Sequence, residues 1–283
     1  MAKRFLAAAL GVPAVLALCW WGPQPFSIGV AALAVVAALE LICAFRASGV
    51  RPGLVFAALG LIGPALPLIY PEGLSAAGAM PLTSVAMVAI TALICGMIME
   101  VARASAQPAA HVATQSGAGL FCGVYVALFG SISSLRLADG IQMNAAITSP
   151  GSGFWLVILV LCCVWSTDTG AYMVGSRIGR TRLAPTLSPR KTVEGAVAGF
   201  TAGILVGAIL GHFMLGRSLL GWMIGACAGT AGQLGDLFAS AVKRELGIKD
   251  FGSLIPGHGG VMDRCDSLLF VAPLVWVLVR MFG

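Results

Sequence analysis

Apolar stretches long enough to cross a membrane follow one another along the whole chain, with short polar links between them. A transmembrane helix needs about 20 predominantly apolar residues. Nine stretches approach this length, near residues 5–22, 25–45, 53–70, 79–100, 116–135, 153–175, 193–215, 219–238 and 265–282. The pattern predicts an all-α, polytopic integral membrane protein with about nine transmembrane helices. Prolines and serines interrupt the third and fifth stretches most.

Composition excludes a water-soluble or disordered protein, and charge orients the chain. Of the 283 residues, 59% are hydrophobic and 10% are charged, whereas charged residues make up about 25% of an ordinary soluble domain. With the amino terminus in the cytoplasm, nine alternating spans leave only Arg136, Arg217 and Arg280 of the 17 basic residues on the far side. Because lysine and arginine concentrate in cytoplasmic loops, we expect a cytoplasmic amino terminus in a multi-pass protein of a cell (inner) membrane.

Glycines recur every four residues along the seventh predicted span, from Gly195 to Gly211. Small residues at this spacing form a groove on one helix face, where another helix backbone can approach closely. We expect this groove to pack helices within the chain, and the alternative is a dimer seam.

Four aspartates lie near the predicted cytoplasmic ends of spans, where a charge is costly and is therefore usually functional. Asp168 lies in the sixth span, Asp236 ends the eighth, and Asp263 and Asp266 begin the ninth. Glu40 lies within the second span, far along the chain from these residues, and we expect it to make a hydrogen bond between helices rather than to act in catalysis. The polar residues therefore divide the chain into an apolar scaffold, residues 1–150, and a region with a cytoplasm-facing catalytic cleft, residues 151–283.

Basic residues collect at the same level as these carboxylates. Ser188 followed by Pro189 is typical of a helix start, with serine as the N-cap and proline in the first position. Arg190 and Lys191 follow directly. A helix amino terminus beside two cations would be a suitable site for a phosphate group.

A second basic group follows the eighth span. Lys243 shares one face with Asp236 and Ser240 if the helix continues beyond the span. The basic residues and the histidine of this region are Lys243, Arg244, Lys249, His258 and Arg264. With the glycine-rich turn 256–260, they suggest metal-assisted phosphate chemistry, because aspartate oxygens are suitable Mg²⁺ ligands. The alternative is a basic loop that only fixes topology, which does not explain the converging aspartates.

The segment 240–266 closely resembles the signature of the phosphatidate cytidylyltransferase (CDP-diacylglycerol synthase) family, with every charged position filled. The segments 168–172 and 188–195 also resemble that family, so the resemblance spans about residues 165–266. Two uncharged positions depart from the pattern, Cys265 and Val193. The resemblance implies transfer of the CMP moiety of CTP to phosphatidic acid, with pyrophosphate as the second product. It also implies Mg²⁺, often a second cation such as K⁺, frequently a homodimer, and no nucleic-acid partner.

The resemblance further implies roles for individual residues. The catalytic residues would be Asp236, Asp263, Lys243, Arg244 and His258. The substrate-binding residues would be Lys191, Arg190, Ser188, Lys249, Arg264, Ser240, Asp168, Thr169 and Tyr172. The metal ligands would be Asp236, Asp263 and Asp266.

Two other functions are compatible with a polytopic protein of this kind. A CTP-dependent kinase of lipid alcohols would share the membrane setting and the nucleotide, but it would transfer the γ-phosphoryl group. A membrane transporter would place its polar site near mid-membrane, often between internal repeats. The polar residues here cluster at one face, which favours the cytidylyltransferase.

Overall fold

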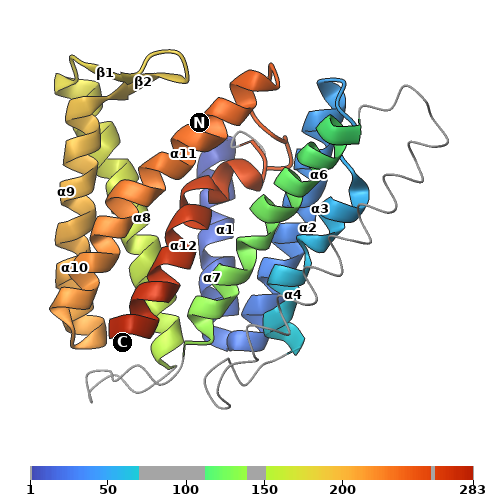
Figure 1. The fold of residues 1–283 in the computed structure, drawn as a ribbon. Helices are drawn as coiled ribbons and strands as arrows, with labels where there is room; N and C mark the ends of the chain where they lie inside the picture. Colours follow the sequence, from blue (N-terminus) through green and yellow to red (C-terminus); the bar gives the residue numbers. More distant parts are fainter. Residues whose placement is uncertain (1, 70–111, 139–150, 256–258, 283) are drawn as a thin grey trace.

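The structure is a computed structural model, which describes residues 2–69, 112–138, 151–255 and 259–282 (Figure 1). The helices of the first half are α1 (Ala2–Trp21), α2 (Pro23–Ala47), α3 (Leu54–Leu59), α4 (Ile62–Ile69), α6 (Val112–Ala127) and α7 (Phe129–Arg136). The second half contains α8 (Ser152–Ile178), β1 (Arg182–Ala184), β2 (Ser188–Thr192), α9 (Val193–Leu210), the π-helical η1 (Gly211–Leu215), α10 (Ser218–Cys227), the π-helical η2 (Ala228–Gly232), α11 (Gln233–Glu245) and α12 (Met262–Phe282). The two ends of the chain lie at opposite ends of the helix bundle (Figure 1).

Five helical segments of the described chain are long and apolar enough to cross a membrane. They are Pro23–Ala47, Ala113–Arg136, Ser152–Ile178, Val193–Leu215 and Met262–Phe282. These segments coincide with the second, fifth, sixth, seventh and ninth predicted spans, so the prediction of an all-α membrane protein is confirmed. The fourth predicted span, 79–100, lies outside the described residues, and the count of nine stays a prediction.

Both of the weaker predicted spans are broken into two helices, but not at the residues expected to interrupt them, because the prolines lie within α4 and the serines within α7. The third predicted span is two short helices, α3 and α4, joined by a turn at Gly60 and Leu61. In the fifth, Leu128 separates α6 from α7. A Cβ atom at Gly60 would overlap the backbone of Gly123, so the third and fifth spans cross at glycines. The eighth span continues through η2 into α11 and ends at Glu245, beyond the predicted end.

The glycine face of α9 packs against two helices of the same chain. A Cβ atom at Gly199 would lie 2.6 Å from the carbonyl oxygen of Thr167 on α8. Gly207 lies against the backbone of Gly221 and Gly225 on α10. The expected packing within the chain is therefore confirmed, because this groove is filled by α8 and α10.

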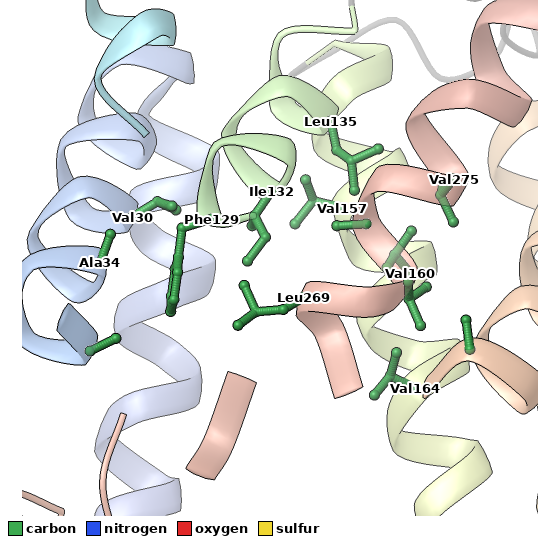
Figure 2. Packing of buried hydrophobic residues seen from close by; sticks show 14 of the residues in the cluster. Val30, Ala34, Phe129, Ile132, Leu135, Val157, Val160, Val164, Leu269 and Val275 are labelled. Atoms are coloured by element: carbon green, nitrogen blue, oxygen red, sulfur yellow. The ribbon is translucent and has the colours of Figure 1, made fainter. Parts of the chain in front are cut away.

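Helix α12 runs through the middle of the bundle, between α7 and α8 (Figure 1). Figure 2 shows Phe129 of α7 between Val30 and Ala34 of α2 on one side and Leu269 of α12 on the other. On its other side, α12 packs with α8 around Val160 (Figure 2). Packing on both sides fixes the helix that carries Asp263 and Asp266.

The link between α8 and α9 forms a small antiparallel hairpin instead of a helix start. β1 pairs with β2, with Arg182 opposite Thr192. Helix α9 begins at Val193, and the Thr192 side chain accepts a hydrogen bond from the Gly195 N–H. The prediction that Ser188 caps this helix and Pro189 begins it is therefore wrong. Pairing with β1 holds residues 188–192 in an extended conformation. The hydroxyl of Thr192, the last residue of this strand, serves as the N-cap of α9 instead.

The α9–α10 contact predicts unequal effects for two glycine substitutions. Gly207→Ala places a methyl group against the α10 backbone, and such overpacking typically costs about 1–3 kcal/mol. Gly117→Ala on α6 is the matched control, because no atom lies within 4 Å of a Cβ there. We expect Gly207→Ala to lower the midpoint of thermal unfolding in detergent by several degrees, and Gly117→Ala to leave it unchanged or raised. Equal shifts in the two variants would contradict the packing account.

Candidate active site

Carboxylates from three helices meet at one end of the bundle. Asp168 lies on α8, Asp236 on α11, and Asp263 and Asp266 on the first turns of α12. Asp236 lies within electrostatic range of both Asp168 and Asp266. Like charges brought together in this way repel one another unless cations share the site. The structure therefore brings together the aspartates that the sequence singled out.

Two lysines pair with two of these carboxylates. The Nζ atom of Lys191 lies 2.5 Å from Oδ2 of Asp236, which joins β2 to α11. The Nζ atom of Lys243 lies 2.8 Å from Oδ1 of Asp263, which joins α11 to α12. The first pair is partly open to solvent, with side-chain exposures of 26% and 33%, whereas the second has exposures of 12% and 2%. The Lys191–Asp236 pair is therefore the more accessible of the two from the solvent.

The Asp263 carboxylate is held by the backbone as well as by lysine. Its Oδ2 atom accepts hydrogen bonds from the N–H groups of Phe251, at 2.8 Å, and Gly260, at 3.0 Å. Gly259 between these segments has φ +85°, and a Cβ there would lie 3.1 Å from Oδ2 of Asp263. The Lys243 ammonium and two backbone N–H groups thus fix the direction in which the Asp263 carboxylate points.

A further carboxylate reaches this region from the first half of the chain. Glu40 on α2 accepts hydrogen bonds from the N–H groups of Val261, at 3.1 Å, and Met262, at 3.0 Å. The expected hydrogen bond between helices is confirmed, but Glu40 is close in space to the loop that holds Asp263. In the sequence, Glu40 stood out as a single acidic residue within an apolar span. The sequence alone did not indicate which helix its side chain would contact.

Helix α11 continues far enough to align its polar residues as predicted. Asp236, Ser240 and Lys243 lie along α11, which ends at Glu245. The Arg244 guanidinium makes long hydrogen bonds, at 3.4 Å, to the carbonyl groups of Leu187 and Ile248. Arg244 therefore connects the end of α11 to the hairpin and contacts none of the four aspartates directly.

The remaining predicted site residues differ in how deeply they are buried. Asp266 is buried, and its Oδ1 accepts the Ser267 N–H at 2.7 Å. Arg264 is exposed and lies within electrostatic range of Asp168. Tyr172 is 75% exposed. The others at solvent-exposed or half-buried positions are Ser188, Arg190, Thr169, Ser240 and Lys249. His258 lies outside the described residues, and its role stays a prediction.

Sequence reasoning missed Tyr125 on α6. Its ring contacts Phe238 of α11 and Phe270 of α12, with centroids 5.7 and 6.3 Å apart. The side chain is buried, and its hydroxyl has no hydrogen-bond partner among the described residues. Tyr125 lies within electrostatic range of Asp236, Asp263 and Asp266. Only its place in the fold distinguishes it from other aromatic residues of an apolar helix.

Glu194, in the first turn of α9, belongs to the hairpin rather than to the carboxylate cluster. It accepts hydrogen bonds from the N–H groups of Arg180 and Thr181, both at 3.1 Å. These two donors follow α8 directly. The side chain therefore ties the start of α9 to the segment that enters the hairpin, and so helps to position Lys191 on β2.

The donor set fits a magnesium ion that also binds phosphate. In the part of the chain that is described, no three acidic, histidine or cysteine side chains are close enough to form a metal cage. Mg²⁺ is usually held by one or two carboxylates together with waters and substrate phosphates. Asp236 is partly exposed, and Oδ1 of Asp263 retains a lone pair beyond the contact with Lys243, since an ionised carboxylate has about four acceptor positions. Two carboxylates together with waters and phosphate oxygens would therefore suffice to hold such an ion.

The fold and this cluster define a helical membrane protein with an acidic and basic site at one end of its bundle. Residues 2–282 match the cytidylyltransferase family. This chain belongs to the cytidylyltransferase family. It is 35% identical over 295 residues to the phosphatidate cytidylyltransferase of Synechocystis sp., and the match covers 98% of this chain and 96% of that protein.

Two other relatives match over shorter lengths. The phosphatidate cytidylyltransferase of Staphylococcus saprophyticus is 42% identical over 143 residues, which cover 50% of this chain and 55% of that protein. The phosphatidate cytidylyltransferase of Bacillus subtilis is 37% identical over 134 residues, or 46% and 49% of the two chains. These two matches span about half of each relative, whereas the match to the Synechocystis protein spans nearly all of it.

The buried ion pair predicts a specific pattern of stability. Lys243→Met leaves the Asp263 charge without its cation. Loss of one partner of a buried pair typically costs about 3–5 kcal/mol, and the two backbone donors to Asp263 should reduce this cost. We expect a clearly lower unfolding midpoint in detergent, and partial recovery in the double variant Lys243→Met/Asp263→Asn. Lys249→Met, at an exposed position, is the control. Additive effects of the two substitutions would contradict the pairing.

Proposed function

We propose that this protein transfers the CMP moiety of CTP to phosphatidic acid, giving CDP-diacylglycerol and pyrophosphate. The observation that carries the proposal is the set of paired lysines and aspartates at one end of a membrane bundle, in a chain of the cytidylyltransferase family. Relatives that match over nearly the whole chain or over half of it are named for this activity. The protein therefore acts in phospholipid biosynthesis.

The main difficulty of the reaction is the repulsion between two anionic substrates, and no strong base is needed. An oxygen of the phosphatidic acid monoester attacks the α-phosphorus of CTP. A new P–O bond forms there as the bond to the bridging oxygen of the β-phosphate breaks, and pyrophosphate leaves with that electron pair. A phosphate monoester has a second pKa near 6, so the nucleophile is largely ionised at neutral pH. The site must mainly reduce repulsion and stabilise the leaving group.

The lysines supply much of this charge compensation. Lys191 lies on the partly open side of the site, where the nucleotide phosphates can enter. Lys243 lies deeper, against Asp263. Arg244 and Arg264, at exposed positions around the same cluster, add positive charge for the phosphate groups of CTP and of the lipid. Fixed cations of this kind stabilise the charge that develops on the departing pyrophosphate.

We propose Asp236 and Asp263 as the residues that hold Mg²⁺, with Asp266 and Asp168 close by. When bound, the ion would neutralise phosphate charge and act as a Lewis acid on the α-phosphate. A second cation such as K⁺ and a homodimer, both implied by the family resemblance, remain part of this proposal. In this proposal His258 hydrogen-bonds a phosphate or donates a proton to the leaving group.

The proposed orientation places the site at the cytoplasmic face. In this orientation all nine predicted spans cross a cell membrane, the amino terminus lies in the cytoplasm, and most basic residues lie on the same side as the site. The hairpin that carries Lys191 lies at the same end of the bundle as the amino terminus (Figure 1). CTP would reach the site from the cytoplasm, and phosphatidic acid would enter sideways from the inner leaflet.

Label transfer distinguishes this function from a CTP-dependent lipid kinase. Purified protein in detergent receives Mg²⁺, phosphatidic acid and CTP labelled at either the α- or the γ-phosphorus. We expect the α-label in the lipid product and the γ-label in pyrophosphate, because the bond beyond the α-phosphorus breaks. Tested on a long-chain alcohol, a lipid kinase would instead place the γ-label in lipid. A transporter would place neither label there.

The metal role of Asp236 has a matched test on the same helix. Asp236→Asn keeps the size of the side chain but removes its charge, and we expect turnover to fall at least a hundredfold, as for other lost electrostatic contacts at a reacting group. Glu245→Gln makes the same change at an exposed position at the end of α11 and should leave turnover unchanged. Protein abundance is measured in parallel. Near-normal turnover in Asp236→Asn would remove this residue from the metal site.

A further inference from the structure

We infer that Glu40 is a positioning residue for the proposed reaction. Its carboxylate holds the start of α12 and thereby fixes the direction of Asp263. Glu40 comes from α2, which lies in the apolar first half of the chain, more than 200 residues before the residues it binds. The inference rests on the proposed metal-binding role of Asp263 and adds a residue that touches neither substrate.

The Glu40 carboxylate binds two adjacent backbone groups. Its Oε1 atom accepts the Val261 N–H at 3.1 Å, and its Oε2 atom accepts the Met262 N–H at 3.0 Å. These donors lie at the amino terminus of α12, where N–H groups lack partners within the helix. The positive end of the helix dipole also favours an anionic side chain there. Both carboxylate oxygens are therefore used, each by a different residue.

Two glycines make this approach sterically feasible. Cβ atoms at Gly252 and at Gly260 would each overlap the Glu40 carboxylate. Both glycines belong to the segment that precedes α12, and Gly252 follows Phe251, whose N–H binds Asp263. The loop therefore lies directly on the Glu40 side chain.

Three consecutive N–H groups, at the end of this loop and the start of α12, each donate to either Asp263 or Glu40. The Gly260 N–H donates to Asp263, and the next two, from Val261 and Met262, donate to Glu40. A displacement of the loop would move all three donors together. The Asp263 carboxylate would then lose the backbone contacts that aim its Oδ1 atom at Lys243 and at the proposed ion site. This is how a residue on α2 controls the geometry of a ligand on α12.

The identity of the side chain matters because both of its oxygens accept. Glutamine has one carbonyl oxygen, and its amide group would present hydrogens to the second backbone N–H. Glu40→Gln should therefore release one of the two donors while it keeps the volume of the side chain. Glu40→Asp keeps the charge but is one methylene shorter, so it should weaken both contacts.

The test measures the loop and the ion site separately in the full-length protein in detergent. Hydrogen exchange follows the amides of residues 259–262, and electron paramagnetic resonance measures the affinity for Mn²⁺ as a substitute for Mg²⁺. We expect Glu40→Gln to speed exchange in this segment and to weaken Mn²⁺ binding about tenfold, as for other residues that orient metal ligands. Leu39→Gln adds the same side chain at the neighbouring, 57% exposed position of α2 and should change neither quantity.

Activity provides a third measurement with a separate meaning. In Glu40→Gln the Mg²⁺ concentration for half-maximal turnover should rise about tenfold, whereas KM for phosphatidic acid should stay within about twofold. Unchanged Mn²⁺ affinity with faster exchange would overturn the inference and leave Glu40 as a structural anchor only. If Glu40→Gln does not fold, Glu40→Asp decides by the same measurements, with a smaller loss of affinity expected. A wild type that makes no CDP-diacylglycerol would refute the proposed function, whereas the Mn²⁺ affinities would still decide the role of Glu40.

Discussion

The N–H groups at the amino terminus of α12 have no acceptors within the helix. The rest of the site depends on which carboxylates accept their hydrogen bonds. Glu40 accepts two of these N–H groups, and Asp263 accepts the N–H group just before them. A carboxylate within a membrane helix costs at least about 2.5 kcal/mol on insertion scales, and these donors offset that cost. The same contacts orient Asp263 toward Lys243. One arrangement thus stabilises the helix and prepares the site.

The glycines of α9 contribute through backbone packing. Because Gly199 lies against α8 and Gly207 against α10, these three helices come within backbone contact. That contact determines where α8 presents Asp168 and where the hairpin presents Lys191. Helix α11 follows α10 through η2 and brings Asp236 to Lys191. π-Helical segments frequently occur beside functional sites, and η2 directly precedes the helix that carries Asp236. Close packing of uncharged residues therefore sets the spacing of the charged ones.

The sequence predicted the long apolar helices and the convergence of the aspartates because each leaves a local signal. A span is recognised by the length of its apolar stretch, and an aspartate at the end of such a stretch is easily identified in the sequence. The error at Ser188 arose because a serine and proline pair fits a strand as well as a helix start, and pairing with β1 decided between them. The contacts of Glu40 and Tyr125 depend on which helices are neighbours, and apolar periodicity does not encode that in one sequence. The role of Tyr125 and the partners of Glu40 therefore emerged only from the fold.

The central claim is that aspartates from α11 and α12 hold one divalent ion, which also binds the nucleotide. Anomalous diffraction at the manganese edge, from crystals grown with CTP and Mn²⁺, tests it most directly. The account predicts a single peak bonded to carboxylate oxygens of Asp236 and Asp263 and to a phosphate of CTP. A manganese peak bonded to neither carboxylate, with both aspartates still paired with Lys191 and Lys243, would contradict it.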